Sequence, residues 1–559
     1  METMITGSML RDAFISASNC ISNNKKAIDE LNVFPVPDGD TGTNMSMTLS
    51  NAKKELELMA DDVTVSQVAK VMASGLLRGA RGNSGVITSL LFKGFDKALA
   101  GQETADIELM TASLEKGVER AYKAVMKPTE GTILTVARLA SVKARELVGV
   151  ETDLVSYWEQ VCVEAERVLD TTPDLLPTLK KAGVVDAGGK GLCMIFRAML
   201  QVFKGEGVVA DETQKKQAEA VTIETYASVV GSFEDEITYT YCTEYIVKKD
   251  VKKTDGSALK LRAYLESIGD CVVVVEDDEI IKVHVHTNNP GLAVEKGLEF
   301  GSMTLPKIEN MRYQHEAKKD EKKKVTVSSS NKVYESVPPE KDYGFVAVAT
   351  GEGIEAMFKD AGADCIVRGG QTMNPSTEDI LAAIQSTPAR TVFVLPNNKN
   401  IIMAAEQAVK LADRKVCVLQ TRTIPQGLSA LLAFDPSADY NTNSTEMTKA
   451  FERVQTGQVT FAARDSEFDG VEIHEGEILA MDNGKLSLVE KDAVKAAYKL
   501  TKRLIRPDSE FISVIYGKDV KEAEAEALRA KLEEKFGSRL DINVINGGQP
   551  VYYYIISVE

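Results

Sequence analysis

Residues 31–45 read Leu-Asn-Val-Phe-Pro-Val-Pro-Asp-Gly-Asp-Thr-Gly-Thr-Asn-Met and separate two stretches in which apolar residues recur every three or four positions. The first stretch runs from Ile5 to Leu31 and the second from Met45 to Met59. This spacing buries one face of an α-helix. Because the same pattern returns as far as residue 203, we predict that residues 1–204 form an all-α, antiparallel helical bundle or barrel with short loops.

The pattern changes after a polar stretch at residues 204–220, which is typical of a linker. Residues 221–315 contain strand-like segments and a short helix, which predicts an α+β middle domain. A lysine run, a serine triplet and two adjacent prolines indicate a second linker at residues 316–341. From residue 342 to 559, apolar strands alternate with helices, which predicts an α/β C-terminal domain with parallel strands.

The composition restricts the class of protein. The chain has 559 residues and a formal net charge of −17, which argues against a protein that mainly binds nucleic acid or an anionic membrane. Its seven cysteines are few, odd in number and without a Cys-x-x-Cys pair, so we expect them to be reduced. We expect neither a signal peptide nor a transmembrane segment, and we therefore predict a cytoplasmic protein.

Two carboxylates in the opening stretch are candidate metal ligands. Asp38 and Asp40 stand two residues apart around a glycine, so both can turn to one side of the loop. Such oxygen ligands suit Mg²⁺, which usually takes its other ligands from phosphate and water. Thr41, Thr43 and Asn44 begin the next helix, where N–H groups and the helix dipole favour a phosphate. The alternative interpretation is a surface turn with an Asp or Thr cap.

Three more glycine-bearing loops precede predicted helices in the same region, at residues 78–85, 128–132 and 183–191. Glycine lets a ligand approach the backbone, and the helix starts can bind phosphate, but each loop alone is equally explained as a capped turn. If the helices alternate in direction, such loops reach one end of the bundle and converge on one ligand. Neither a P-loop nor a strand-borne Gly-x-Gly-x-x-Gly motif is present. The candidate nucleotide-binding residues in these loops are Gly82, Asn83, Ser84, Gly131, Thr132, Asp186 and Gly188.

A second candidate site lies in the middle domain. His284 and His286 are two residues apart on a predicted strand, so they share one face of it, and Val283 and Val285 take the other. Cys242 on a neighbouring strand would add a thiolate, and Zn²⁺ accepts nitrogen and sulfur ligands. The alternative is a pair of half-exposed strand histidines.

The C-terminal domain carries one more polar loop, at residues 369–377, with Ser376 or Thr377 as the cap of the next helix. This loop would bind an anion or, more simply, join a strand to a helix.

The segments PVPDGDTGTNM, RGARGNSGV, PTEGTIL and GVVDAGGKGL together resemble the DhaL-type kinase domain of the dihydroxyacetone kinase superfamily. The spelling of the first segment is similar to that of the fatty acid kinase catalytic subunit. The resemblance implies a helical barrel that binds ATP at one rim through Mg²⁺ on Asp38 and Asp40, with Thr41 beside them in the catalytic centre. Dihydroxyacetone kinases carry a further Asp where this chain has Asn32, whose amide oxygen brings no charge to the metal.

The same resemblance implies an activity and partners. It implies transfer of the γ-phosphoryl group of ATP to the carboxylate of a fatty acid, giving an acyl phosphate. A separate DegV-like fatty-acid-binding protein would present the acid and dock on the C-terminal domain, which is itself similar to such proteins. The resemblance also implies a zinc site at Cys242, His284 and His286, and a homodimer formed through the middle domain.

Three other functions remain open on the sequence. A kinase for a small ketose or polyol would use the same first domain. A regulator that senses nucleotide without turnover would need no acceptor. Zinc hydrolase chemistry in the middle domain is the weakest, because no His-Glu-x-x-His motif or comparable base is present.

Overall fold

The computed structural model describes residues 4–32, 39–125, 128–212, 240–249, 261, 264–265, 267–276, 280–310, 336–370, 373–463, 465–468 and 471–559. The chain divides into two compact units. One joins Met1–Thr213 to Tyr334–Glu559, and the other is Gln214–Val333. Each is described by itself.

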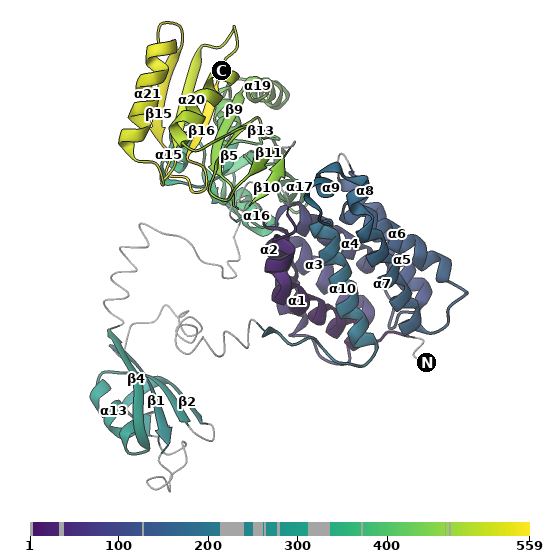
Figure 1. The fold of residues 1–559 in the computed structure, drawn as a ribbon. Helices are drawn as coiled ribbons and strands as arrows, with labels where there is room; N and C mark the ends of the chain where they lie inside the picture. The colour runs from purple at the N-terminus through teal and green to yellow at the C-terminus, as the bar shows by residue number, and fades with distance from the viewer. Residues whose placement is uncertain are drawn as a thin grey trace. The chain divides into compact units, whose positions relative to one another are not determined.

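The N-terminal part of the first unit is entirely helical in its described residues, which confirms the predicted fold class (Figure 1). Each long helix packs against the next one in the chain, and the last packs against the first, so the helices close into a ring. The helices are α1 (Gly7–Asp29), α2 (Thr41–Leu56), α3 (Val65–Gly79), α4 (Gly82–Ala98), α5 (Ile107–Ala124), α6 (Ile133–Leu147), α7 (Leu154–Asp170), α8 (Thr172–Leu175), α9 (Pro177–Ala182) and α10 (Ala187–Phe203). Two short helices, α8 and α9, lie in the chain between α7 and α10.

Large side chains and close backbone contacts hold this ring together. Trp158 on α7 is fully buried, packs edge-on against Phe196 and Phe203 of α10, and donates its indole N–H to the Phe196 carbonyl at 3.0 Å. The α4–α5 pair is tightest at Gly94, where an added Cβ would lie 2.2 Å from the backbone nitrogen of Gly117. The apolar faces predicted from the sequence are therefore the surfaces along which the helices pack.

The C-terminal domain begins with a four-stranded parallel sheet in the order β6-β5-β7-β8, as the alternating pattern predicts. Helices connect its strands, because parallel neighbours need crossover connections. These elements are β5 (Lys341–Ala349), α15 (Glu352–Asp360), β6 (Cys365–Arg368), α16 (Thr377–Ser386), β7 (Ala389–Leu395), α17 (Ile402–Val409), β8 (Lys415–Val418), α18 (Ile424–Leu432) and α19 (Tyr440–Arg453).

A second, mixed sheet of six strands completes the domain, in the order β13-β12-β9-β16-β14-β15. Its β12–β13 hairpin turns through Asn483 and Gly484, both with positive φ, as is typical of an Asn-Gly turn. The elements are β9 (Gln455–Phe461), the small pair β10 (Ser466–Phe468) and β11 (Val471–Ile473), β12 (Ile478–Asp482), β13 (Lys485–Glu490), α20 (Ala493–Leu504), β14 (Phe511–Tyr516), α21 (Glu522–Phe536), β15 (Asp541–Asn546) and β16 (Tyr554–Val558).

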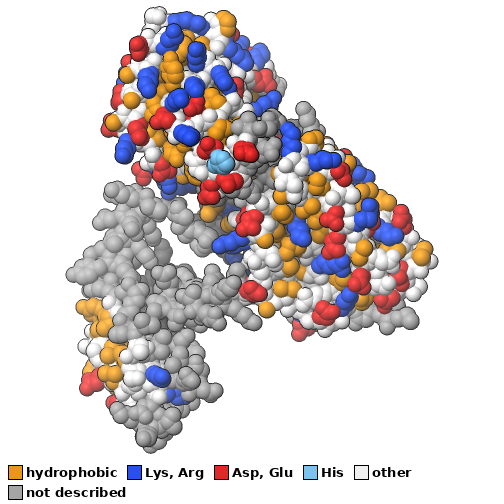
Figure 2. Space-filling model, in the orientation of Figure 1, with side chains coloured by type: hydrophobic (Ala, Val, Ile, Leu, Met, Phe, Trp, Pro, Cys, Tyr) orange, Lys and Arg blue, Asp and Glu red, His pale blue; other side chains and the backbone are white. Residues whose placement is uncertain are grey.

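The helical and C-terminal domains share one continuous apolar core. Buried residues of the parallel sheet and of α16 and α17 belong to the same cluster as those of α3 and α4. On the face shown in Figure 2, acidic and basic side chains alternate over both domains. In the described part of the chain, no helix has the length and apolar character that crossing a membrane requires.

The second unit contains a four-stranded antiparallel sheet in the order β2-β3-β1-β4. Its described residues also include the helix α13 (Pro290–Leu298). Tyr245 on β1 and Val283 and Val285 on β3 are buried in its core. The Tyr245 hydroxyl donates to the carbonyl of Ala293 at 2.5 Å, which ties the helix to the sheet. The strands are β1 (Tyr241–Lys249), β2 (Gly269–Glu276), β3 (Ile280–Thr287) and β4 (Gly301–Asn310).

Candidate functional site

The start of α2 is the centre of the candidate site. Asp40 precedes the helix, but its side chain does not cap it. The cap comes from Asp29 at the end of α1, whose carboxylate accepts from the N–H groups of Gly42 at 2.7 Å and Thr43 at 3.1 Å. The Thr43 hydroxyl also donates to Asp29, at 2.8 Å. Two of the N–H groups predicted to bind phosphate are therefore already bonded to a carboxylate, and the side chain of Asp40 does not cap the helix.

Asn32 lies against the same helix start. The hydroxyl of Thr41 donates to its amide oxygen at 3.1 Å. With the amide turned the other way, its oxygen instead accepts from the backbone N–H of Asp40 at 3.1 Å. In either orientation Asn32 positions the residues that begin α2, whereas its role as a magnesium ligand stays a prediction. Asp38, the partner of Asp40 in the predicted metal pair, lies outside the described residues.

The start of α4 packs directly against the start of α2. Gly82 has a φ of +56°, in the left-handed region that favours glycine, and an added Cβ would lie 2.6 Å from the Asn44 side-chain nitrogen. The backbone N–H of Arg81 donates to the hydroxyl of Thr48 at 3.2 Å. The structure thus brings Asp40, Asn44 and Gly82 together, and Asn83 and Ser84 follow Gly82 in the first turn of α4.

The starts of α6 and α10 form a second pair. Thr132 caps α6, and the N–H of Gly131 donates to the Thr135 hydroxyl at 2.8 Å. Asp186 caps α10 by accepting from the N–H of Gly189 at 2.7 Å. The position of Gly188 is close to Ile133, since an added Cβ would lie 3.3 Å from the Ile133 Cβ. The predicted residues of these two loops are therefore neighbours, although several of their polar atoms already serve as caps.

Burial changes the chemistry of Asp186. Desolvation raises the pKa of this carboxyl to about 6, against the effect of the N–H groups that donate to it from Gly189 and Ile133. The ionised form of Asp186 is therefore less favoured than that of an ordinary surface aspartate.

The two pairs of helix starts lie at the same end of the ring. Gly191 of α10 is so close to Met45 of α2 that an added Cβ would lie 2.6 Å from the Met45 sulfur. Each of these residues stands in the early part of its helix, so the two helix starts are level. Four helix N-termini, those of α2, α4, α6 and α10, therefore share one rim of the helical domain. Helix N-termini favour anions through free N–H groups and the helix dipole.

The C-terminal domain reaches this rim through the loop between β6 and α16. The Asn374 side-chain amide donates to the Asp40 carboxylate at 2.5 Å, and Arg81 donates to the Asn374 carbonyl at 2.7 Å. Arg81 also forms an ion pair with Asp379 at 3.3 Å. Ser376 caps α16, as predicted, by accepting from the N–H of Asp379. Arg81, in the glycine-bearing loop at residues 78–85, therefore contributes to the domain contact.

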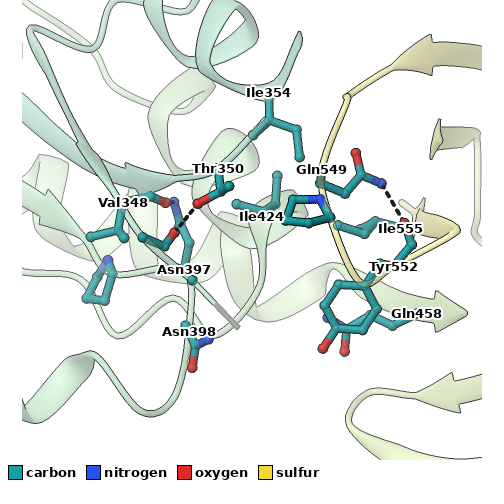
Figure 3. A pocket seen from close by; sticks show the side chains of 14 residues that line it. Val348, Thr350, Ile354, Asn397, Asn398, Ile424, Gln458, Gln549, Tyr552 and Ile555 are labelled. Atoms are coloured by element: carbon teal, nitrogen blue, oxygen red, sulfur yellow. Dashed lines mark hydrogen bonds between the residues drawn. The ribbon is translucent and has the colours of Figure 1, made fainter. Parts of the chain in front are cut away.

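The same loop begins at a small cavity within the C-terminal domain. Gly369 and Gly370 line it together with residues that follow β5 and β7, at the carboxyl ends of the parallel strands. Figure 3 shows Thr350 and Asn397 from this sheet facing Gln549 and Tyr552 from the segment before β16. Ligands of open α/β sheets bind at this edge, next to a change in strand order such as that between β5 and β7.

The predicted zinc residues are placed by strand register. Cys242 on β1 is directly opposite His286 on β3, and Glu244 is opposite His284. The register thus makes these four positions neighbours on adjacent strands. The side chains of Cys242 and His284 lie outside the description, and among the residues that are described no group of three or more His, Cys, Asp or Glu could hold a metal. Zinc at this site stays a prediction.

Two residues of the candidate rim, Asp29 and Asn374, were missed by the sequence analysis. Asp29 is three residues before Asn32, in the last turn of α1, and a carboxylate next to an uncapped helix start could have signalled it. Asn374 is 334 positions from Asp40, and no local pattern connects the two.

Comparison with known proteins identifies domains of a kinase family. Residues 35–201 match the DAK2 domain, residues 238–318 the middle domain of FakA-like fatty acid kinase proteins, and residues 344–559 the C-terminal domain of the same proteins. The protein YloV of Bacillus subtilis is 42% identical over 557 residues, covering 99% of each chain. The uncharacterized protein SAR1202 of Staphylococcus aureus is 39% identical over 560 residues, covering 100% of each chain.

Solved structures show only distant similarity. A fatty-acid-binding DegV family protein from Thermus thermophilus has a TM-score of 0.30 and 13% identity, covering 39% of this chain and 99% of that one. The dihydroxyacetone kinase from C. freundii in complex with AMP-PNP and Mg²⁺ has a TM-score of 0.30 and 16% identity, covering 39% of this chain and 48% of that one. The family rests instead on the domain matches and on the relatives that align over the whole chain. The chain belongs to the FakA-like fatty acid kinase family and carries the DAK2 domain of that family at its N-terminal side.

Proposed function

We propose that this protein is an ATP- and Mg²⁺-dependent kinase that transfers the γ-phosphoryl group to the carboxylate of a fatty acid presented by a separate protein. The observation that carries the proposal is the shared rim, where the N-termini of α4, α6 and α10 lie at the same end of the domain as the start of α2 and Asp40. Anion-binding helix ends beside a carboxylate are what a metal-bound triphosphate needs. The match to a DAK2 domain supports the same interpretation.

The residues at the rim fit a hard divalent cation. Buried oxygen atoms of Asn83 and Asn374 have no hydrogen-bond partner among the described residues, and Asn374 bonds to Asp40. Mg²⁺ prefers oxygen ligands of this kind. Asp38 and Asp40 would hold the ion, with Asn32 beside them. When bound, the cation would neutralise charge on the phosphates of ATP.

The residues of the chain would mainly bind and orient the nucleotide. The left-handed Gly82 leaves space for a phosphate beside the N–H groups of Asn83 and Ser84 at the start of α4. Thr41, Thr43 and Asn44 at α2, and the loops of Gly131–Thr132 and Asp186–Gly188, would complete the nucleotide pocket. Asp29 holds the α2 start in place. Phosphoryl transfer depends largely on such positioning.

A carboxylate acceptor fits this set of residues. Residues 1–204 contain no histidine, so the rim offers no imidazole as a general base. A fatty acid is already ionised near neutral pH, since carboxyl groups of this type have a pKa of about 4.3, and it needs no base. A ketose or polyol hydroxyl would need its proton removed, which makes the small-polyol kinase the second candidate.

Partner and metal assignments in the rest of the chain complete the proposal. The C-terminal domain would dock a DegV-like fatty-acid-binding protein that carries the acyl chain. The middle domain would hold Zn²⁺ at Cys242, His284 and His286 and join two copies into a homodimer. We further propose that the protein is cytoplasmic.

The test is phosphoryl transfer from [γ-³²P]ATP with Mg²⁺ and acyl-loaded partner protein. We expect label in acyl phosphate, little label with dihydroxyacetone as acceptor, and loss of transfer in an Asp38→Asn/Asp40→Asn double variant. Asp62→Asn, an exposed aspartate of the same domain, is the matched control and should transfer at the wild-type rate. Label in dihydroxyacetone without partner would favour the polyol kinase. Tight ATP binding without turnover on any acceptor would favour a nucleotide sensor.

A further inference from the structure

Asn374 is a residue of the C-terminal domain that contacts the candidate site. Its side chain is 2% exposed, and its amide nitrogen donates to the Asp40 carboxylate at 2.5 Å. Arg81 fixes the Asn374 backbone by donating to its carbonyl at 2.7 Å. Next to it, the N–H of Thr377 donates to the carbonyl of Ala80 at 3.1 Å, and Ser376 pairs with Arg81 in a short antiparallel bridge. The loop is therefore bonded to the rim through backbone as well as side chain.

In these contacts the side-chain nitrogen of Asn374 forms a hydrogen bond, but its side-chain oxygen does not. Its oxygen is buried and has no hydrogen-bond partner among the described residues, and the same holds for the side-chain oxygen of Asn83. The two asparagines flank Gly82, where an added Cβ would lie 3.3 Å from the Asn374 side-chain nitrogen. Buried polar atoms in native proteins are almost always bonded, so an unbonded amide oxygen beside a carboxylate is a position for a missing donor or cation.

We propose that Asn374 is a positioning residue of the kinase site, supplied by the C-terminal domain: its amide N–H orients Asp40, and its amide oxygen faces the hydrated divalent cation. This inference rests on the proposed function and adds to it, because it makes the C-terminal domain part of the metal site as well as a docking platform. Residues that orient a metal ligand typically change metal affinity 10–100-fold when they are removed.

The opposite interpretation is that the loop obstructs the rim. If the loop only blocked the rim, the polar atoms of Asn374 would be expected to form all their hydrogen bonds within this contact. The side-chain oxygen of Asn374 argues against this, since it is buried and has no hydrogen-bond partner among the described residues. The two interpretations predict opposite changes in cation affinity when Asn374 is removed.

The experiment uses the full chain and Mn²⁺ as a paramagnetic probe, with free Mn²⁺ measured by electron paramagnetic resonance in the presence of ADP. We expect Asn374→Ala to weaken Mn²⁺ binding about 10-fold. The matched control is Asp379→Asn, which removes the ion pair with Arg81 at the same domain contact and leaves Asn374 unchanged. This control should bind Mn²⁺ as the wild type does.

The outcomes separate the two levels of the proposal. If the wild type binds no Mn²⁺ with ADP, the proposed function itself fails. If the wild type binds and Asn374→Ala binds equally well or more tightly, only the role of Asn374 is overturned, and tighter binding identifies the loop as an obstruction. If Asn374→Ala does not fold, hydrogen exchange of the wild type decides: Mn²⁺ and ADP should slow exchange in residues 373–380, and unchanged exchange would reject the role.

Discussion

The starts of α2 and α10 look alike in sequence and differ in how their aspartates are used. In Asp-Gly-Asp-Thr-Gly before α2 and Asp-Ala-Gly-Gly before α10, an acid precedes glycines at a helix start. Asp186 caps its own helix, whereas Asp29 caps α2 in place of Asp40. The difference teaches that an aspartate can turn toward other partners, as Asp40 does toward Asn374, when another residue satisfies the helix end.

The largest expected effect compares these two aspartates directly. Asp40→Asn removes a charge that no helix end requires, so we expect phosphoryl transfer to fall at least about 100-fold, about 2.7 kcal/mol in activation free energy. Asp186→Asn keeps an oxygen that can accept from Gly189, so we expect less than about a 10-fold loss. Transfer rates at saturating ATP and Mg²⁺ measure both. Equal losses in the two variants would show that both aspartates act on the reaction.

The second prediction concerns Asp29, which caps α2 in place of Asp40. Asp29→Ala removes the acceptor of two N–H groups and of the Thr43 hydroxyl at the start of α2. Loss of a helix cap of this kind destabilises a protein by about 1–2 kcal/mol. We expect a matching decrease in the free energy of unfolding, measured by urea denaturation, and weaker nucleotide binding.

The control for Asp29 is another helix cap far from the rim. Asp439→Ala removes the cap of α19 in the C-terminal domain and should lower stability by a similar amount without changing nucleotide affinity. If Asp29→Ala bound nucleotide as tightly as this control, the α2 start would not be part of the nucleotide site.

The sequence predicts the helices that begin after the two aspartates, but it does not predict which residue caps each helix. Periodic apolar residues are enough to place the helices, and the alternation of apolar strands with helices indicates the parallel sheet, because these signals are local. Asp29 is distant by one loop and Asn374 by more than half the chain. Their bonds to the α2 region depend on how helices and domains pack, and no short-range pattern encodes that packing.

The third prediction tests how closely the α4 start must approach α2. Gly82→Ala places a Cβ 2.6 Å from the Asn44 amide in a left-handed backbone, and we expect about 2 kcal/mol of destabilisation. Gly101→Ala is the matched control, because its φ is also positive, at +78°, but no atom lies within 4 Å of the added Cβ. It should show only the backbone penalty of about 1 kcal/mol. Urea denaturation of both variants gives the difference, and equal destabilisation would show that the α2–α4 contact yields without strain.

The smallest effect concerns the charge of Asp186. Since burial raises its pKa to about 6, the folded protein holds a proton on this carboxyl that the unfolded chain has already released. Its contribution to stability therefore falls as pH rises from about 4 to about 6 and is constant above that. Asp186→Asn cannot ionise, so relative to the wild type it should gain about 1 kcal/mol or more between pH 4.5 and pH 7. Urea denaturation at the two pH values measures this gain. A stability difference that is the same at both would mean that Asp186 titrates like a surface aspartate and that its carboxyl is not desolvated at the α10 start.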